Sequence, residues 1–465
     1  MRPSLVALIG MGAALAATPA LPCSAFIATS SDRAVLAKNF DWHLEGGYLI
    51  KSPRGVMRRG LPLFGSETPS WTSRYGSLTL SQYGVGLPYG GMNEQGLAVE
   101  MLWLDETVYG GRATRSIGEL EWIQLQLDSR STVAEVLEHL DELAIHPMGG
   151  KIHYVLADAS GDKALVEFVD GVARVFRGED GRLVTTNDTR RVSELAFEGL
   201  RTGDLRGNTS RVRYARLRRD LEALKEPPGA GESFALLDRV AERGSPYRTQ
   251  WSVVYDLRAR EMHIRPDLAG PVFRVEAGSL DYAEGSGFSF QDLRSKGLAT
   301  AAFAPLTLNA QRPLLARNLP RAGIDQDLDA INAHLLDAGK SKVNALSDRS
   351  TLVVEVTTSS PGAFARIAVF RNEREIRAQT AQFAGSVLMD ATARKFAFYN
   401  LSKGRYAVGA YHDLNQNGRH EPAEPLAFFR PKAGGGAAFA DLSFDLTESS
   451  RLVSIRLAPD APASR

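Results

Sequence analysis

The chain contains one cysteine, Cys23, which follows a stretch with the composition of an N-terminal leader. A thiol attacks an acyl carbon effectively when a base accepts its proton. If Cys23 becomes the first residue of the mature chain, its own α-amino group, with a pKa of roughly 7.7 to 8, can be that base. The sequence therefore predicts an N-terminal cysteine that supplies both nucleophile and base.

Residues 1–22 have a basic start, an apolar run over 5–17 and small residues near the exit, which is typical of a secretory signal peptide. We expect an exported protein, periplasmic or secreted, with no internal disulfide because Cys23 has no partner. Two other interpretations of Cys23 stay open: an incidental residue, or a lipidated cysteine that anchors the protein to a membrane. Lipidation and catalysis exclude each other, because lipoprotein maturation blocks both amine and sulfur. Leu21 and Pro22 fit the lipoprotein signal poorly.

Alternating residues after Cys23 and over 34–42 predict two strands of a hairpin, with Asp41 close to the cysteine. A cysteine after a leader, followed about eighteen residues later by Asn39-Phe-Asp41-Trp, resembles the choloylglycine hydrolase and penicillin V acylase family in its Gram-negative form. The members are N-terminal-nucleophile amide hydrolases. The resemblance implies that Cys23 is the nucleophile and that Asp41 holds its α-amine.

Three further segments agree with the family in order and spacing. The segment 90–97 resembles the family's Gly-Met-Asn-Glu turn, in which Asn93 has a supporting role. The resemblance also implies that Asn187 contributes an amide to the oxyanion hole. It implies that Arg211 lies beside the nucleophile, where a cation lowers the pKa of the thiol. Taken alone, each of these segments could equally be a turn, a cap or a solvated helix.

The chain departs from the family pattern at two positions. Lys38 stands where many members have arginine, which keeps a supporting charge but loses the planar guanidinium. Trp103 stands where the bile salt hydrolases of Gram-positive bacteria have asparagine, so a backbone N–H has to replace one oxyanion donor. Trp42, Trp103 and Tyr89 are the candidate substrate-binding residues, because aromatic rings suit an aryl or alkyl acyl chain. The competing interpretation is that they only pack the core.

Runs of strands interrupted by paired helices favour an α+β fold. The resemblance implies an N-terminal-nucleophile hydrolase domain over 23–290, a four-layer αββα sandwich. Residues 291–347 contain breaking prolines and one amphipathic stretch from Asp325 to Leu336, which predicts a linker with a short helix. Short strands recur over 348–460 and predict a small all-β sandwich of uncharacterised type. The expected strands of that sandwich are 351–356, 365–370, 395–399, 404–411 and 442–446.

The last domain contains a pattern of alternating oxygen-bearing residues. Asp413, Asn415 and Asn417, with Glu424 at the twelfth position, match a calcium-binding loop. The flanking strands exclude a complete EF-hand, and an Asx-rich hairpin loop is the alternative. We expect no cofactor for catalysis, and calcium is the one ion that the sequence suggests.

The charge balance excludes several classes of function. With 55 Lys and Arg against 54 Asp and Glu, the net charge of +1 gives no electrostatic footprint for nucleic acid. No apolar run after the leader approaches the roughly 18 residues that a transmembrane helix needs. We therefore expect an exported hydrolase of linear amide C–N bonds in small N-acyl compounds: penicillin V, an N-acyl homoserine lactone or a conjugated bile acid. The alternatives are a lipid-anchored, non-catalytic surface protein, or an acyltransferase using the same thioester. Homo-oligomer formation stays open.

Overall fold

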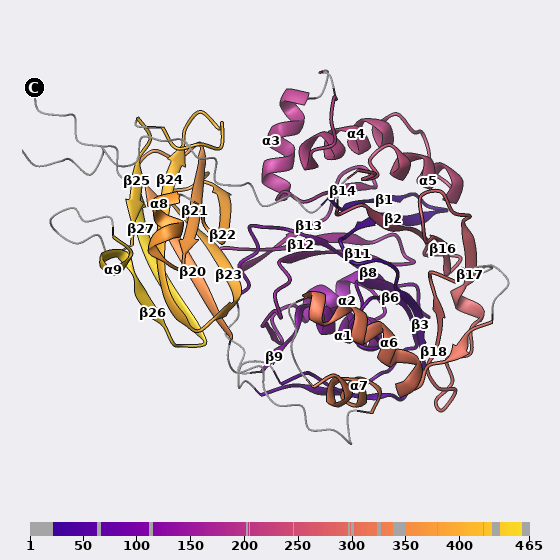
Figure 1. Cartoon of the computed structure of the whole chain (residues 1–465). Coiled ribbons are helices and arrows are strands. Elements are labelled where there is room, and N and C mark those ends of the chain that lie inside the picture. The colour runs from indigo at the N-terminus through magenta and orange to yellow at the C-terminus, as the bar shows by residue number, and fades with distance from the viewer. Residues whose placement is uncertain are drawn as a thin grey trace, which may run out of the picture.

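The computed structural model describes residues 22–62, 67–110, 115–200, 203, 205–244, 246–295, 298, 302–322, 327–337, 349–378, 380–421, 423–429 and 438–457. The predicted signal peptide lies outside the described residues, except for its last residue, Pro22. Among the helices in these ranges, none has the length and apolar character needed to cross a membrane. Figure 1 shows two bodies, a larger one with helices on both sides and a smaller body of strands.

One sheet of the larger body carries the predicted nucleophile at the start of its strand β1. All of its strand pairs are antiparallel, in the order β14-β1-β2-β15-β16-β17. The predicted hairpin is present, with Ser24 of β1 opposite Asn39 of β2. The strands are β1 (Ser24–Thr29), β2 (Ala34–Asp41), β14 (Arg182–Thr185), β15 (Thr249–Asp256), β16 (Glu261–Arg265) and β17 (Phe273–Glu276).

The second sheet is antiparallel and larger, in the order β13-β12-β11-β8-β7-β6-β3-β18-β19. Its inner strands are almost entirely buried because both faces are covered, one by the first sheet and the other by helices. The strands are β3 (Tyr48–Ser52), β6 (Ser77–Ser81), β7 (Gly90–Asn93), β8 (Ala98–Trp103), β11 (Ile152–Ala157), β12 (Lys163–Val169), β13 (Val172–Phe176), β18 (Ser289–Asp292) and β19 (Ala304–Pro305). Two short pairs accompany it, β4 (Met57–Arg59) with β5 (Ser70–Thr72), and β9 (Ser116–Ile117) with β10 (Ala144–Ile145).

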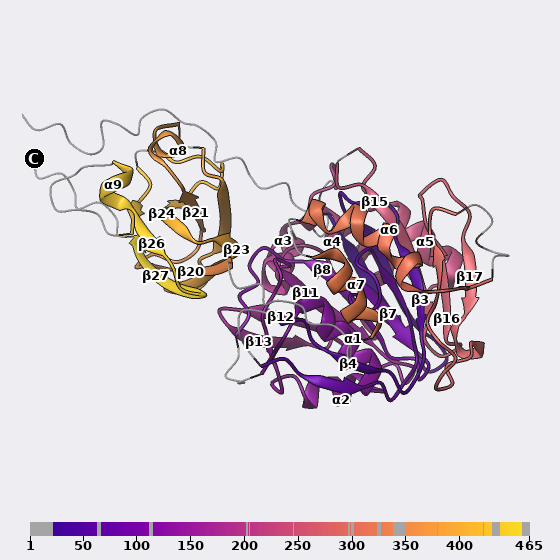
Figure 2. The same cartoon turned by 60° about the horizontal axis from the view of Figure 1, so that its bottom comes forward.

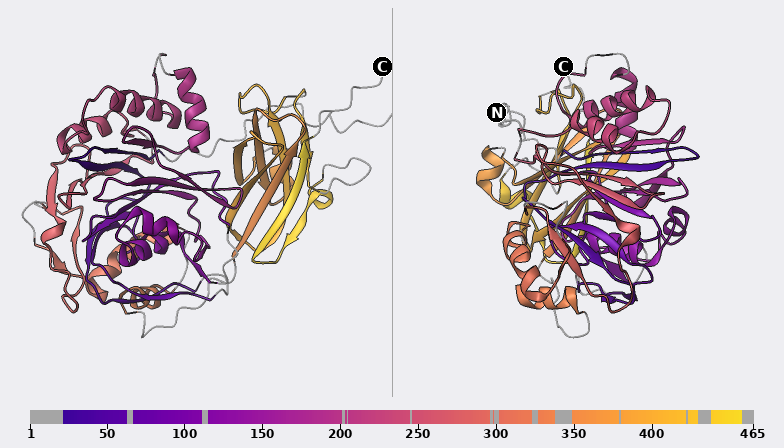
Figure 3. Two further views of the ribbon diagram at one scale, coloured as in Figure 1. Left: turned by 180° about the vertical axis from the view of Figure 1, so that it is seen from behind. Right: turned by 90° about the vertical axis from the view of Figure 1, so that its right-hand side faces the viewer.

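Helices complete four layers, as Figures 1 and 3 show. The helices α3 (Arg190–Leu200), α4 (Ser210–Glu222) and α5 (Ala230–Asp238) cover the outer face of the first sheet through one apolar cluster. The helices α1 (Glu119–Ser129), α2 (Val133–Glu138), α6 (Leu308–Asn318) and α7 (Leu328–Leu336) lie on the side of the second sheet. The predicted four-layer αββα sandwich is confirmed.

The prediction of a linker over 291–347 is wrong for the part that the structure describes. Strand β18 pairs with β3, and α6 and α7 pack against each other and against the larger body. Gln311 of α6 accepts a hydrogen bond from the backbone of Val85 at 2.8 Å and is fully buried. Pro313 lies inside α6 without ending it, because burial of its leucine neighbours outweighs one lost backbone hydrogen bond. The predicted helix is α7, while residues 323–326 and 338–348 lie outside the described ranges.

The smaller body is the predicted all-β sandwich, whose two sheets face each other in Figure 2. An apolar core lies between them. One sheet has the order β23-β20-β27, and the other β22-β21-β24-β25 with β26 paired to β24. The strands are β20 (Arg349–Thr358), β21 (Phe364–Phe370), β22 (Phe383–Leu388), β23 (Ala393–Ser402), β24 (Gly404–Asp413), β25 (Leu426–Phe428), β26 (Phe444–Leu446) and β27 (Ser450–Leu457). The helices α8 (Glu373–Ala378) and α9 (Phe439–Leu442) flank it. Leu442, predicted to open a strand, ends α9 instead.

Candidate active site

Cys23 lies directly before β1, with its sulfur enclosed by the end of β2. Its Sγ is 3.5 Å from the backbone nitrogen of Asp41 and 3.6 Å from the carbonyl oxygen of the same residue. The cysteine is 2% exposed. Because Pro22 precedes it, the nitrogen of Cys23 is a peptide N–H. It donates to Oδ1 of Asn187 at 2.8 Å.

The carboxyl group of Asp41 is buried and is short of hydrogen-bond partners. No hydrogen bond of normal geometry reaches either of its oxygens from the described residues. Burial raises the pKa of Asp41 to about 8, and its neighbours Thr249 and Arg213 oppose this shift only in part. A buried, unpaired carboxylate is unfavourable, so this position suits a cationic or hydrogen-bond-donating partner.

Asn187 connects the cysteine to the second sheet. Its Oδ1 accepts from the nitrogen of Cys23 and from Nη2 of Arg213, both at 2.8 Å. Its Nδ2 donates to the carbonyl oxygen of Trp103 at 2.9 Å. An amide NH₂ has two hydrogens, so this contact occupies one and leaves the other for a ligand.

The arginine beside Cys23 is Arg213, which corrects the assignment of Arg211. Arg213 is fully buried and donates to the carbonyl oxygen of Cys23, to Oγ of Ser24 at 2.7 Å and to Asn187. The side chain of Arg211 is 38% exposed and lies 3.6 Å from the carboxylate of Asp188. Residues two apart on a helix point about 200° apart, so only one of the two can face the site.

Sequence reasoning missed Arg213, although the helical phase contained the signal. Helix α4 starts after Thr209, whose hydroxyl accepts from the nitrogen of Val212. Its buried positions recur at helical spacing and include Arg213, whereas Arg211 falls off that face. The buried positions of α4 are Ser210, Arg213, Tyr214, Ala215, Leu217 and Leu221.

The thiol is neutral in this state of the chain. Burial, and then the charge of Asp41, raise the pKa of Cys23 to about 11, whereas Lys38 and Arg213 lower it. The expected effect of a neighbouring arginine therefore has the right direction but is smaller than the effect of burial. A base has to accept the proton during any attack by this sulfur.

Lys38 forms a buried ion pair that joins the two sheets. Its Nζ lies 2.6 Å from Oε2 of Glu100, and both side chains are almost inaccessible. Tyr255 donates to the other oxygen of Glu100 at 2.5 Å. A Cβ at Gly90 would fall 2.1 Å from Oε2 of Glu100, which explains why a glycine stands there. The electrostatic support predicted for Lys38 acts from within this pair.

Trp42 and Trp103 converge beside the cysteine. Their ring centroids are 5.9 Å apart, and both indoles are partly exposed. Tyr89 is buried beneath them, 6.5 Å from Trp42 and 4.5 Å from Phe40. Nε1 of Trp103 donates to Asp105, whereas Nε1 of Trp42 is buried without a partner among the described residues. The two partly exposed indoles are placed to contact a ligand, and Tyr89 supports them.

Asn93 has a structural role in its turn. Its Oδ1 accepts from the nitrogens of Gln95 and Leu97 at 3.1 Å, and its Nδ2 donates to the carbonyl oxygens of Leu127 and Arg130. It thereby ties the turn between β7 and β8 to the end of α1. Its supporting role therefore concerns the turn.

The predicted calcium loop is closed by its own hydrogen bonds. Oδ2 of Asp413 lies 2.8 Å from Arg366, and the two oxygens of Glu424 accept from the backbone nitrogens of Leu414 and Glu421 at 2.9 Å. Asn415 and Asn417 are exposed and accept bonds from within the loop. Within the described ranges, no three His, Cys, Asp or Glu side chains gather as metal ligands. Calcium binding here stays a prediction.

A cavity of about 550 Å³ lies beside the end of β2. Thr249, which pairs with Asp41, and Gln250, which donates to the carbonyl oxygen of Trp42, both line it. Phe273, Leu293 and Leu298 are among its apolar wall residues. The cavity therefore adjoins the backbone that carries Asp41 and Trp42.

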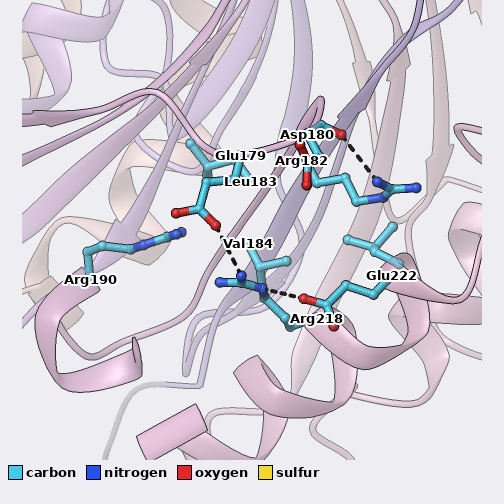
Figure 4. A pocket seen from close by; sticks show the side chains of 9 residues that line it. Glu179, Asp180, Arg182, Leu183, Val184, Arg190, Arg218 and Glu222 are labelled. Atoms are coloured by element: carbon cyan, nitrogen blue, oxygen red, sulfur yellow. Dashed lines mark hydrogen bonds and ion pairs between the residues drawn. The ribbon is translucent and has the colours of Figure 1, made fainter. Parts of the chain in front are cut away.

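A smaller polar cavity of about 50 Å³ lies between β14 and α4 (Figure 4). Arg218 contacts Glu179 at 3.3 Å and Glu222 at 2.9 Å. Arg190, on the other side, pairs with Glu194. Because these guanidinium groups already have carboxylate partners, we assign no ligand to this cavity.

Comparisons with known proteins find relatives for both parts of the chain. Residues 353–454 match a family described as an uncharacterized protein conserved in bacteria. A penicillin V acylase from Pectobacterium atrosepticum is 29% identical over 208 residues, which are 40% of this chain and 53% of the relative. The chain thus spans about half the length of that curated relative.

Solved structures give similar relatives. A penicillin V acylase from Agrobacterium tumefaciens is 27% identical with a TM-score of 0.50, covering 58% of this chain and 90% of that one. A conjugated bile acid hydrolase from Clostridium perfringens is 18% identical with a TM-score of 0.49, covering 58% and 96%. Residues 23–198 match the family described as linear amide C-N hydrolases, choloylglycine hydrolase family, and this part of the chain is a domain of that family.

Proposed function

We propose that the protein is an exported amidase that hydrolyses the linear amide C–N bond of small N-acyl compounds, with Cys23 as its N-terminal nucleophile. The observation that carries the proposal is the arrangement around Cys23. The backbone nitrogen of Cys23 donates a hydrogen bond to Asn187, and its carbonyl oxygen accepts one from Arg213. Its sulfur lies against the backbone of Asp41. The membership of residues 23–198 in an amide hydrolase family supports it.

Removal of residues 1–22 would convert the peptide nitrogen of Cys23 into an α-amine. Asp41 supplies a buried carboxylate without a hydrogen bond of normal geometry, which can orient that amine and stabilise it when it is protonated. Asn187 already accepts from the same nitrogen at 2.8 Å. Processing would therefore install the base at a position that the fold has already prepared.

In the acylation step, the sulfur of Cys23 bonds to the acyl carbon while the α-amine accepts the thiol proton. The carbonyl oxygen becomes an oxyanion, for which the second Nδ2 hydrogen of Asn187 and a backbone N–H, such as that of Trp103, are the donors. The C–N bond then breaks and the α-amine returns the proton to the leaving nitrogen. Water then adds to the thioester carbon while the α-amine accepts its proton. The C–S bond breaks, the proton returns from the α-amine to the sulfur, and the carboxylic acid leaves.

The acyl group would contact Trp42 and Trp103, whose indoles present apolar faces beside the nucleophile. Both suit an aryl or alkyl chain. The similarity to two penicillin V acylases favours phenoxyacetyl penicillin as the first substrate to assay, followed by long-chain N-acyl homoserine lactones and conjugated bile acids.

The first test is the mass of the N-terminal peptide of protein from its native compartment. An unmodified Cys23 at the N-terminus supports the mechanism. A diacylglyceryl group on Cys23 blocks the sulfur, and retention of Leu21 or Pro22 leaves the nitrogen in a peptide bond. Either result moves the assignment to an anchored, non-catalytic protein.

The second test compares the protein that begins at Cys23 with its Cys23→Ser variant in amine release from N-acyl amides. The variant should fold and lose turnover, whereas retained turnover excludes the thioester mechanism. Adding a competing amine separates hydrolysis from acyl transfer, because a transferase would form a new amide instead of the free acid.

A further inference from the structure

The β-sandwich lies against the larger body near the outer edge of the second sheet, as Figures 1 and 2 show. We infer that this sandwich is a positioning element of the amidase site, because its aromatic side chains brace the two segments that carry Trp103 and Asn187. The inference rests on the proposed function for its catalytic consequence. It also assigns a role within this chain to a domain that matches a family described only as uncharacterized.

The sandwich is docked through strand β23. Arg394 lies 3.0 Å from the carboxylate of Asp170, in the turn between β12 and β13, and Asp170 also accepts from the backbone nitrogen of Lys395 at 2.8 Å. The hydroxyl of Tyr399 accepts from the backbone nitrogen of Tyr109 at 2.9 Å. Their rings are 5.8 Å apart. These contacts combine a largely buried ion pair with hydrogen bonds to backbone groups. Together they fix the position of β23 on the larger body.

The first brace reaches Trp103 through Lys151. Nζ of Lys151 lies 3.6 Å from the ring centroid of Phe396 in β23, and it donates to the carbonyl oxygen of Asp105 at 2.7 Å. Asp105 in turn accepts from Nε1 of Trp103 at 2.7 Å. The ring of Phe396 thus positions the ammonium group of Lys151, and that group in turn fixes the segment after β8.

The second brace reaches Asn187 through Arg211. The guanidinium of Arg211 lies 5.2 Å from the ring centroid of Phe364, the first residue of β21, and 3.6 Å from the carboxylate of Asp188. Asp188 directly follows Asn187. Arg211 therefore links the sandwich to the segment after Asn187, whereas Arg213 is the arginine that contacts Cys23.

The two braces meet at one point. Asn187 and Trp103 are joined by the Nδ2 bond of 2.9 Å, so both indirect contacts end on one hydrogen-bonded pair. Glu106 lies between the braced segments, where burial and the charges of Asp188 and Asp105 raise its pKa to about 8 while Arg394 lowers it. Small displacements of such groups reduce rates strongly, so a supporting domain affects turnover without touching substrate.

The test alters only the sandwich, in the protein that begins at Cys23 and keeps all later residues. Phe364→Leu and Phe396→Leu remove the aromatic faces but keep apolar side chains. The matched control is Phe444→Leu, in β26 of the same sandwich, where the ring contacts Phe429 and Arg451. Thermal melting compares the three variants in stability.

We expect the two brace variants to lower kcat/KM for amide hydrolysis at least about tenfold, with altered acyl-chain preference, and the control to stay within about twofold. Cys23 is the only cysteine in the chain, so its alkylation by iodoacetamide reports the site without any substrate. The alkylation rate should change in both brace variants and not in Phe444→Leu.

The outcomes separate the two proposals. If the protein that begins at Cys23, with no other change, releases amine from no N-acyl amide, the proposed function fails, and the alkylation rates alone judge the bracing. If the alkylation rates of all three variants equal that of the intact chain, the sandwich does not position the site and the inference is overturned. Equal losses in all three variants also overturn it, because they would reflect general loss of sandwich stability.

Discussion

Arg213 and Asn187 are hydrogen-bonded to each other at 2.8 Å and together hold both backbone polar groups of Cys23. Arg213 takes the carbonyl oxygen, and Asn187 takes the nitrogen. Cys23 is thus held by its main chain, and its sulfur takes no part in these hydrogen bonds. The same pair ties β1, β14 and α4 together at one point of the first sheet.

Replacing Arg213 should therefore damage both the site and the fold. Arg213→Ala leaves the carbonyl oxygen of Cys23 and Oδ1 of Asn187 short of buried donors, which destabilises by about 2 to 4 kcal/mol. We expect loss of amide hydrolysis and a lower melting temperature. Arg219→Ala, on the exposed side of the same helix, is the control and should change neither. An Arg213→Ala variant with full activity would contradict the role given to this pair.

Asp41 should give the unprocessed chain a distinct pH dependence. Its carboxyl ionises near pH 4 when unfolded, whereas its pKa in the folded chain is about 8. Between these values the folded state keeps a proton that the unfolded state has lost, so the free energy of unfolding falls as the pH rises. Asp41→Asn removes this contribution.

Thermal melting of Cys23→Ala, with and without Asp41→Asn, measures this effect in chains that keep residues 1–22. The stability difference in favour of Asn should grow from about pH 4 to about pH 8 and then level off. A difference that does not vary with pH would show that the Asp41 carboxyl has an ordinary pKa.

Trp42 and Trp103 should determine which acyl group binds. Trp42→Leu and Trp103→Leu each remove aromatic contact area from the site. In each variant, KM for an aryl-acyl substrate should rise roughly tenfold. The backbone groups of Trp103 stay, so kcat should fall less. Trp71→Leu is the control, since Trp71 lies in β5, which pairs with β4, and its indole donates to Asp128 of α1. Unchanged KM in both variants would show that the two indoles only pack the core.

Addition of calcium tests whether the loop that begins at Asp413 binds this ion. If the loop binds the ion, millimolar calcium raises the melting temperature of the full chain, and Asp413→Ala abolishes the shift. Arg366→Gln should increase the shift, because it frees the oxygen that Arg366 occupies. No shift in either the intact chain or Arg366→Gln would reduce the segment to a hydrogen-bonded turn.

Local patterns were sufficient for much of the fold and of the site. Strand alternation placed Cys23 and Asp41 in one hairpin, whereas Asn187 and Trp103 were named as oxyanion donors only through the resemblance to the family. The motif around Arg211 identified the right helix but not its rotation, which is set by the apolar face that packs under the first sheet. The identity of the buried arginine therefore required helical phase as well as motif position.

The segment after 290 could not be placed from local signals. Strand β18 pairs with β3, about 240 residues earlier, and no short-range pattern encodes such a pairing. Prolines at 305 and 313 suggested broken structure, yet α6 accommodates Pro313 because its leucines are buried. The contacts of the sandwich with Lys151 and Arg211 are long-range in the same way.

The enclosure of Cys23 also affects how long the thiol survives before maturation. With Pro22 attached, Cys23 is 2% exposed and burial raises the pKa of its thiol to about 11, so the sulfur is neither accessible nor ionised near neutral pH. Peroxides and disulfides react with exposed thiolates and only slowly with buried neutral thiols. While Pro22 is attached, the single thiol of the chain is therefore protected from oxidation.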